Sequence, residues 1–347
     1  MTPNDETASL PTIGAAGAAT APLAGEGRRR RKIAALAAIL AVIAIIIVII
    51  IRILGGSTPL PSIPTELPHH VSDIYGVSQP MGVAVSPSGN RVYVSESEGR
   101  RLVRVFDSSG HQIGTLTPQG GSPSFRLPVY VAVSPKTEEV FVSDRLRENI
   151  EVYSPSGKYL RSVQLPGHAN GKANPLGLAF GPEGDLYVTD VGGGRQHHRV
   201  LVLNSSATQI LRAIGTPGMF WFPNGLVLDA KGDLYVADSN NGRVLIFNPA
   251  GRRVSEIGRG SGEGDLGLPR GIAIKGNRLF VVDATAMMVR VYRLPNDASE
   301  TPVYIGSFGG EGIGDGQFQY PNGIAIDRNG RIYITDRQNG RVQNWEY

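Results

Sequence analysis

Six acidic residues recur at one position of a repeated sequence pattern, and a set of such carboxylates could bind a cation. Each one follows a short apolar segment such as LYVA or IYIT. The residues are Glu96, Asp144, Asp190, Asp238, Asp283 and Asp336. An arginine follows several of them at close spacing, so the pattern favours structural ion pairs over a metal site.

The expected arginine partners leave one of these acids less compensated than the rest. The predicted pairs are Glu96 with Arg101, Asp190 with Arg199, Asp238 with Arg243 and Asp336 with Arg341. Asn149 and Met288 stand at the arginine position of the other two copies. Asp283 is therefore the acid that we predict to be most suited to a functional role.

The chain contains 6 histidines, and a pair of them lies where a loop could present it to a metal. This pair is His197 and His198, in the stretch GGGRQHH. The others are His69 and His70 in a proline-rich segment, His111 in a turn and His168 in a connecting loop. Two adjacent ligands do not make a zinc site, which needs a fuller set at fixed geometry, so we interpret them as structural or solvated.

Composition excludes several kinds of chemistry. The 347 residues include no cysteine, so disulfides, thiolate metal sites and cysteine nucleophiles are absent. No Ser-His-Asp arrangement is recognisable, and the glycine-rich residues 310–316 are not followed by a helix pattern that could hold a phosphate. We therefore assign no catalytic residue.

Internal repeats account for most of the chain and must position these side chains. The clearest copy covers residues 222–258 and reads FPNGLVLDAKGDLYVADSNNGRVLIFNPAGRRVSEIG. The copies begin near residues 79, 127, 174, 222, 268 and 320. Their leading prolines are spaced 46 to 52 residues apart.

Each copy contains up to four short segments with strand patterns, separated by glycine-rich turns and without helical periodicity. One four-stranded sheet in every ~40–50 residues is typical of a propeller blade. The sequence therefore predicts an all-β, six-bladed β-propeller over residues 73–347. The last copy ends without a fourth strand, and we predict that a strand at residues 74–77 completes blade six and closes the ring.

The pattern P-x-G-h-A-h, G-x-h-Y-V-x-D and R-V-h-h-F resembles the NHL repeat across residues 74–347. The resemblance implies a six-bladed propeller. It implies function only loosely, because NHL-like propellers include ligand-binding platforms, sensor ectodomains, RNA-binding modules and a few enzymes.

Two enzymatic branches of these propellers suggest metal sites. The amidating-lyase branch holds zinc through histidines from different blades, which the adjacent pair His197 and His198 does not reproduce. Gluconolactonase-like propellers hold a divalent ion with Glu, Asn and Asp. Asn224 and Asn322 resemble that asparagine position, whereas Met81 stands where the glutamate is expected. A divalent metal at Asp283 with Asn224 or Asn322 is thus the alternative to a protein without a cofactor.

A continuous apolar run near the N-terminus has the length of a transmembrane helix. Residues 33–51 carry no charge or proline, and about 20 such residues cross a bilayer. The preceding RRRRK predicts that the N-terminus is cytoplasmic. The run exceeds the ~7–15 apolar residues of a signal peptide and lacks an A-x-A cleavage pattern. We predict an uncleaved signal anchor at residues 28–53 of a single-pass membrane protein with an extracytoplasmic propeller.

The segments on either side of this anchor have biased compositions. Residues 1–27 predict a disordered cytoplasmic tail, and residues 54–72 predict a proline-rich stalk. The net charge of +4 divides into +3 through Arg52 and +1 beyond it. The basic charge therefore marks membrane orientation, and nucleic acid is not an expected partner.

Departures from the repeat consensus indicate candidate ligand-binding residues. They are Met81, Tyr130, His197, His198, Trp221, Asn224, Arg270 and Asn322. Tyr130 replaces a glycine of the repeat, and Trp221 stands where the last copy has Gln319. Trp221 is either an interface anchor or a residue packed beneath the insertion of the third copy.

Two classes of function follow from these observations. The first is a non-catalytic binding, sensor or scaffold module, tethered to the membrane, whose loop face takes a protein, peptide or glycan. The alternative is an extracytoplasmic metal-dependent hydrolase or lyase of the gluconolactonase-like or amidating-lyase-like type.

Overall fold

The computed structural model describes residues 67–118, 125–169, 171–258 and 262–347. The chain divides into two compact units, Met1–Pro64 and Thr65–Tyr347. The predicted tail (1–27), the predicted anchor (28–53) and residues 54–66 of the predicted stalk lie outside the described residues. Within the described part of the chain, no helix is long and apolar enough to cross a membrane.

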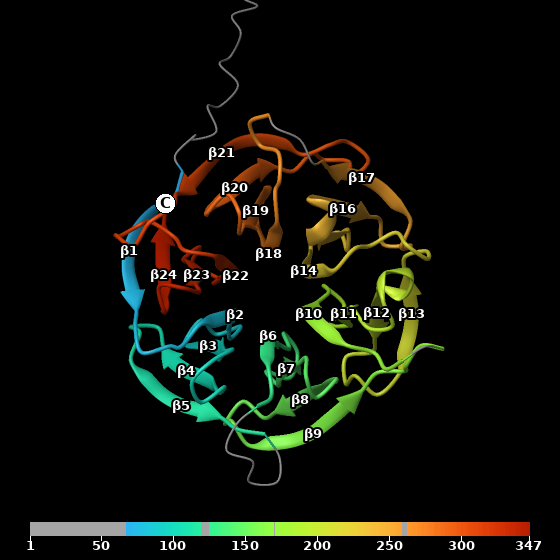
Figure 1. The fold of residues 1–347 in the computed structure, drawn as a ribbon, viewed down its shortest axis with the longest axis horizontal. Coiled ribbons are helices and arrows are strands. Elements are labelled where there is room, and N and C mark those ends of the chain that lie inside the picture. Colours follow the sequence, from blue (N-terminus) through green and yellow to red (C-terminus); the bar gives the residue numbers. More distant parts are fainter. Residues whose placement is uncertain (1–66, 119–124, 170, 259–261) are drawn as a thin grey trace, which may run out of the picture. The chain divides into compact units, whose positions relative to one another are not determined.

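The described residues form six four-stranded antiparallel sheets arranged in a ring, as the sequence predicts (Figure 1). The innermost strands are β2 (Pro80–Val85), β6 (Pro128–Val133), β10 (Pro175–Phe180), β14 (Pro223–Leu228), β18 (Pro269–Lys275) and β22 (Pro321–Ile326). The second strands are β3 (Arg91–Glu96), β7 (Val140–Asp144), β11 (Leu186–Asp190), β15 (Leu234–Asp238), β19 (Arg278–Asp283) and β23 (Ile332–Asp336).

The two outer positions complete each blade. The third strands are β4 (Val103–Asp107), β8 (Asn149–Tyr153), β12 (Arg199–Leu203), β16 (Arg243–Phe247), β20 (Met288–Arg293) and β24 (Arg341–Glu346). The outermost strands are β5 (Gln112–Leu116), β9 (Tyr159–Gln164), β13 (Ile210–Ile214), β17 (Arg253–Ile257), β21 (Val303–Gly309) and β1 (His69–Ile74). Short 3-10 helices, η2 (Arg195–His197) and η3 (Ser239–Asn241), lie in two loops.

Register places the repeated proline opposite the repeated acid in every blade. Pro223 pairs with Asp238, for example, and the equivalent pair recurs in the other five sheets. Each innermost strand therefore begins where the second strand ends. We call this end of the ring the loop face, because it carries the connections between blades and between second and third strands. The opposite end is the turn face.

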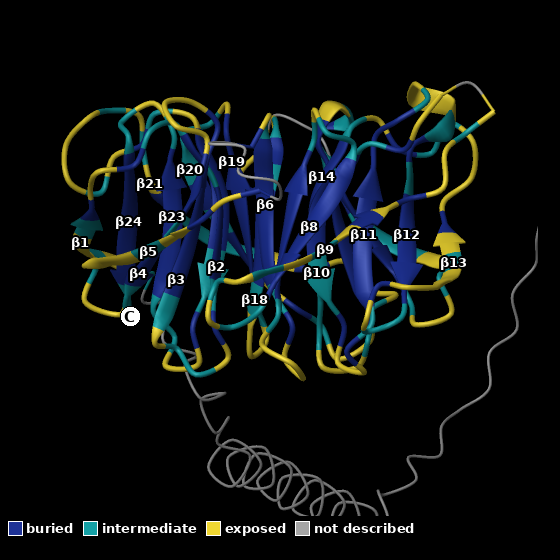
Figure 2. Cartoon of the chain, turned by 90° about the horizontal axis from the view of Figure 1, so that it is seen from below, coloured by how far each residue is buried: buried dark blue, intermediate teal, exposed yellow. Residues whose placement is uncertain are grey.

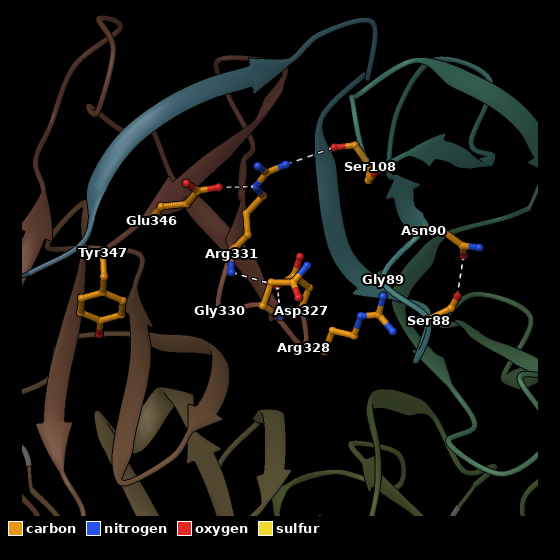
Figure 3. Close-up of a pocket in the computed structure, with 11 residues that line it drawn as sticks. Ser88, Gly89, Asn90, Ser108, Asp327, Arg328, Gly330, Arg331, Glu346 and Tyr347 are labelled. Atoms are coloured by element: carbon orange, nitrogen blue, oxygen red, sulfur yellow. Dashed lines mark hydrogen bonds and ion pairs between the residues drawn. The ribbon is translucent and has the colours of Figure 1, made fainter.

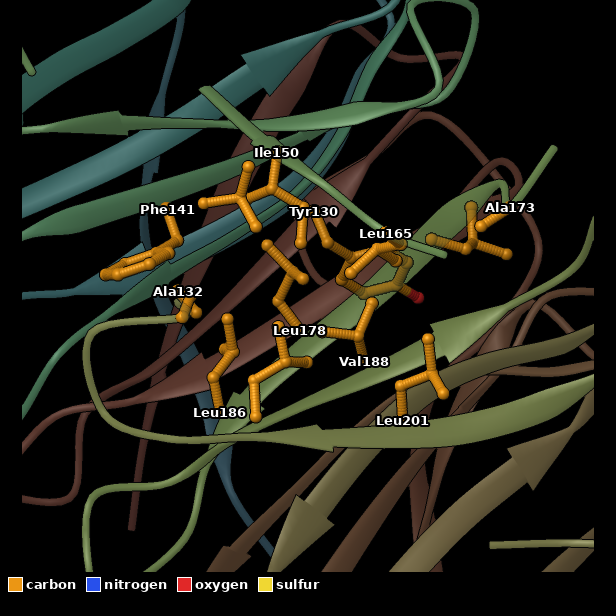
Figure 4. Packing of buried hydrophobic residues seen from close by; sticks show 14 of the residues in the cluster. Tyr130, Ala132, Phe141, Ile150, Leu165, Ala173, Leu178, Leu186, Val188 and Leu201 are labelled. Atoms are coloured by element: carbon orange, nitrogen blue, oxygen red, sulfur yellow. The ribbon is translucent and has the colours of Figure 1, made fainter. Parts of the chain in front are cut away.

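Burial follows the radial order of the strands. The second strand of blade four, β15, is buried along its whole length because a neighbouring blade covers each of its faces. Its β-branched and aromatic residues suit such a surface. The outermost strands are more exposed: β5 and β13, both visible in Figure 2, each expose three of their five residues. Apolar clusters fill the spaces between blades, and Figure 4 shows one of them around Tyr130.

Glycine in the repeated P-x-G lets neighbouring innermost strands approach closely. A Cβ on Gly177 would lie 2.1 Å from the carbonyl oxygen of Asn224, and one on Gly225 would lie 2.6 Å from that of Arg270. Neither distance is compatible with a side chain. The same contact explains the glycine at this position in blades one, five and six.

A hydroxyl at the end of the second strand connects neighbouring blades. Thr189 Oγ1 accepts a hydrogen bond from Gly177 N at 2.7 Å and donates one to the carbonyl of Asn224 in the next blade at 2.9 Å. Equivalent bonds are made by Ser95, Ser143 and Thr335. The repeat thus encodes a polar joint between blades at a position that we did not single out from the sequence.

The ring closes through the N-terminal strand, but with different bounds from those we predicted. Strand β1 is His69–Ile74 and pairs with β24, so the predicted range of 74–77 is wrong by several residues. His69 and His70 belong to this strand and not to a stalk. Arg341 on β24 donates to Asp73 Oδ2 at 3.0 Å, and the His70 ring contacts Trp345 edge-on, so side chains reinforce the backbone pairing.

Candidate functional site

The six repeated acids are completely buried and hold the loops that lead into the innermost strands. Asp238 Oδ1 accepts from Trp221 N at 2.6 Å, and Asp144 accepts from Arg126 N and Leu127 N at 2.8 Å each. Equivalent bonds from backbone N–H groups reach Glu96, Asp190, Asp283 and Asp336. These carboxylates therefore serve as structural acceptors for the repeat.

Arginines neutralise the acids, although one of the four predicted partners is wrong. Asp190, Asp238 and Asp336 pair with Arg199, Arg243 and Arg341 at 3.1, 2.9 and 2.8 Å. Glu96 pairs with Arg104 at 2.5 Å instead of with Arg101, whose guanidinium donates to the carbonyl of Arg126. Arg104 points back to Glu96 because it lies on β4, whereas Arg101 precedes that strand.

Asp283 is not the uncompensated acid that the sequence suggested. Its carboxylate accepts from Gly267 N at 2.8 Å, Leu268 N at 3.0 Å and the Thr285 hydroxyl at 3.1 Å. Arg290 Nε lies 3.6 Å away. The partner was missed because it comes from the middle of β20 and not from its first residue.

The histidine pair also has structural roles. His198 is buried, and its Nδ1 accepts a hydrogen bond from Phe222 N at 3.0 Å. His197 Nδ1 lies 2.8 Å from the carbonyl oxygen of Gly193. Burial lowers the pKa of the His198 ring, which keeps it neutral and able to accept that bond. The Nδ1 atom of each ring is therefore engaged with a backbone group of the protein.

One group of acids and histidine within the described residues has the spacing of metal ligands. It consists of His70, Asp73 and Asp315 near the outer edge of blade six. Arg341 Nη1 lies 3.0 Å from Asp73 and 4.0 Å from Asp315, so a guanidinium already supplies the positive charge. This geometry disfavours a divalent cation there.

The residues between Pro and Gly surround the start of the innermost strands. Asn224 and Asn322 are buried, and Asn322 Nδ2 donates to the carbonyl of Met81 at 2.9 Å. Tyr130 is also buried, and its hydroxyl donates to Asn224 Oδ1 at 3.1 Å, from blade two to blade four. Asn224 and Asn322 therefore contact protein groups, and among the described residues no hydrogen bond joins either of them to Asp283.

Arg270 shares this end of the ring with two further arginines, Arg145 and Arg337. Each of the latter follows a repeated acid directly, where the other blades have Ser97, Val191, Ser239 and Ala284. The guanidinium of Arg145 lies over the Phe222 ring at 5.0 Å. Comparing the residue after each acid across the six copies would have revealed both arginines, but we compared only the acids and their downstream partners.

Trp221 is exposed on the loop face. It retains 41% of its accessible surface, and the guanidinium of Arg195 lies over its ring at 4.8 Å. Arg195 belongs to the insertion of blade three, in η2. The two alternatives for Trp221 therefore coexist: the insertion covers one side of the ring, and the rest faces solvent.

A recess of 570 Å³ lies on the turn face, between blades six and one (Figure 3). Its polar groups are largely engaged with one another. Arg331 Nε donates to Glu346 Oε1 at 2.6 Å, and Arg331 Nη1 donates to the carbonyl of Ser108 at 3.1 Å. We interpret this recess as the seam where the two ends of the propeller meet.

Comparison with known proteins agrees with this architecture. A family model described as the NHL repeat matches residues 220–247 and 318–344. Protein lin-41 from Caenorhabditis elegans is 36% identical over 72 residues, which are 21% of this chain and 6% of that protein. The chain thus spans a small fraction of that relative's length.

Solved structures with a similar fold include both enzymes and binding proteins. Virginiamycin B lyase from Staphylococcus aureus has a TM-score of 0.55 and 16% identity, covering 81% of this chain and 99% of that one. A nidogen/laminin complex chain has a TM-score of 0.54 and 22% identity, covering 66% and 79%. An auxiliary nutrient binding protein from Bacteroides thetaiotaomicron has a TM-score of 0.58 and 14% identity, covering 78% and 70%.

At these identities the solved structures inform the fold alone. Six four-stranded sheets in a closed ring define a six-bladed β-propeller. The family match identifies the repeats at residues 220–247 and 318–344 as NHL repeats, and the other copies share their P-x-G and acid positions in part.

Proposed function

We propose that this protein is a membrane-tethered binding module whose loop face takes a protein, peptide or glycan ligand outside the cytoplasm. The exposure of Trp221 carries this proposal. Tryptophan and arginine are the residue types most often found as interface anchors, and here they stack on each other at the surface. Leu146, Ile313 and Tyr320 are also exposed in loops of this face, with 48%, 75% and 38% of their surfaces accessible.

The arrangement of the carboxylates supports binding over catalysis. General acid–base chemistry needs a carboxyl group that can reach a substrate. The six repeated acids instead direct their oxygens at backbone N–H groups and arginines while completely buried. The fold can then present variable loops on a constant scaffold.

The membrane context rests on residues 28–53 of the sequence. Because the chain has no cysteine, a Ser299→Cys variant carries a single thiol at an exposed position. An extracytoplasmic propeller predicts that a membrane-impermeant maleimide labels this variant in intact cells. Labelling that requires cell lysis would contradict the proposed orientation.

The binding role is tested by crosslinking the full-length chain in its native membrane. We expect a crosslinked partner that is recovered with the wild type and lost with Trp221→Ala. Ile113→Ala is the matched control, because Ile113 is 54% exposed but lies on the outermost strand of blade one. Equal recovery with all three chains would show that Trp221 is not part of the binding surface.

A further inference from the structure

Three arginines are gathered at the loop-face end of the innermost strands without acidic partners. Arg145, Arg270 and Arg337 are partly buried, and none has a carboxylate within 4.0 Å among the described residues. This distinguishes them from Arg104, Arg147, Arg199, Arg243, Arg290 and Arg341, which face the repeated acids.

The backbone connects the groups of this site around the ring. Gly225, the residue after Asn224, lies against the carbonyl of Arg270, and Gly271 lies against that of Asn322. Tyr130 reaches Asn224 through its hydroxyl. Arg270 thus stands next to Asn224 and Tyr130, in a position where its neighbours on the innermost strands are all uncharged.

The positive charges of Arg145 and Arg337 act on Arg270. Burial lowers the pKa of Arg270, and the positive charges of Arg337 and Arg145 lower it further, while Tyr130 and Tyr320 raise it. Burial also lowers the pKa of Arg145. Partly buried like charges without counterions are unfavourable, so a bound anion would relieve their repulsion.

Several polar atoms at this site have no hydrogen-bond partner among the residues that the structure describes. The buried Nε atoms of Arg145 and Arg337 make no hydrogen bond among the described residues. The same is true of Nδ2 of Asn224, a residue with only 2% of its surface accessible. An unpaired buried donor costs free energy, and each of these groups can only donate.

We propose that Arg145, Arg270, Arg337 and the Asn224 amide form a binding site for an oxyanionic group, a phosphate or a carboxylate, at the axis of the loop face. Guanidinium groups recognise the planar or tetrahedral oxygens of such anions through paired hydrogen bonds. The site deepens the proposed function, on which it rests, by giving the ligand a negatively charged group. It excludes a divalent cation from the same position.

The test is calorimetric titration of the full-length chain in detergent, at constant ionic strength, with inorganic phosphate in one arm and citrate in the other. Saturable heat in either arm supports the site and assigns the phosphate or the carboxylate chemistry. We expect Arg270→Gln and Arg337→Gln each to weaken that binding about tenfold or more. The proposal would be overturned if the heats in both arms were no larger than those of a sodium chloride titration. It would also be overturned if both variants bound the anion with unchanged affinity.

Two control variants keep this result separate from the binding role of Trp221. Arg293→Gln removes an exposed arginine at the end of β20 and is expected to bind the anion like the wild type. Trp221→Ala is expected to lose the crosslinked partner but to retain the anion. A thermal melt of each variant establishes that it is folded before titration.

Discussion

The Tyr130 hydroxyl donates a hydrogen bond of 3.1 Å to Asn224 Oδ1, and the two residues lie 94 positions apart, on blades two and four. Both are departures from the repeat. Tyr130 replaces the glycine of the P-x-G pattern, and Asn224 occupies the variable position between Pro and Gly. Their bond spans the end of blade three and ties non-adjacent blades together. Asn224 also belongs to the proposed anion site, and Tyr130 lies beside it.

Tyr130→Phe should destabilise the propeller. The substitution keeps the ring in its apolar cluster but leaves the buried side-chain Oδ1 of Asn224 without the Tyr130 donor, at a cost of about 1–2 kcal/mol. Denaturant unfolding measures the change. Tyr75→Phe serves as the control, because Tyr75 is 63% exposed and its hydroxyl bond to Asp73 should contribute little. Equal stability of the Tyr130→Phe chain and the wild type would show that the bond contributes nothing.

Asp283→Asn should act on stability and not on a catalytic step. The neutral amide leaves Arg290 without its counter-charge and weakens the acceptor for Gly267 N and Leu268 N. We expect a loss of about 3 kcal/mol, in the range measured for broken buried ion pairs. Asp238→Asn should show a loss of similar size, whereas exposed Asp297→Asn should not. A stable Asp283→Asn chain would reopen a functional role for this acid.

Thr189→Val tests the hydroxyl joint between blades three and four. The side chains have nearly equal shapes, so the change removes the bonds to Gly177 N and to the Asn224 carbonyl without opening a cavity. The expected loss is about 1–3 kcal/mol for the buried groups left unpaired. Thermal unfolding with Thr208→Val, an exposed threonine in a turn, provides the comparison. Similar melting temperatures for both variants would argue against the joint.

Strand β1 should be essential to ring closure. Deleting residues 69–74 removes the outermost strand of blade six and exposes the edge of β24, so we expect a large fall in melting temperature and aggregation through that edge. Deleting residues 57–64, which precede the propeller unit, should leave the melting temperature unchanged. Equal melting temperatures for the two truncations would show that β24 does not need a partner.

His198 should make stability depend on pH. Its folded-state pKa is lowered, so the unfolded chain binds the proton more readily, and stability falls as pH drops below about 6.5. The physical cause is burial of the ring. In addition, protonation would stop Nδ1 of His198 from accepting the hydrogen bond of Phe222 N–H. His198→Asn removes the titration, and chemical unfolding between pH 7 and 5 should then show a shallower slope. An unchanged slope would place the pH dependence in another group.

The repeat made the fold predictable. Proline, glycine and acid recur at similar offsets, and each has a structural role. The proline begins the innermost strand, the glycine lets the innermost strand of the next blade approach closely, and the acid accepts hydrogen bonds from the incoming loop. These roles recur from blade to blade, so the pattern of one copy predicts the strands of all six. The existence of a closing strand was predicted correctly, but its residue range was not. The reason is that IYGV and HHVSDI are both short and irregular strand patterns.

The candidate site was less predictable, because it depends on which side chains meet across the ring. The sequence by itself determined the six-bladed architecture, the structural role of most of the repeated acids and the departures from the repeat at Trp221 and Arg270. Only the tertiary structure decided that Arg290 neutralises Asp283, that Tyr130 reaches Asn224, and that Arg145 and Arg337 share the end of the ring with Arg270. The physical reason is closure of the ring. A propeller brings together the first residues of strands that are separated by whole blades, and the spacing of residues within one repeat does not predict those contacts.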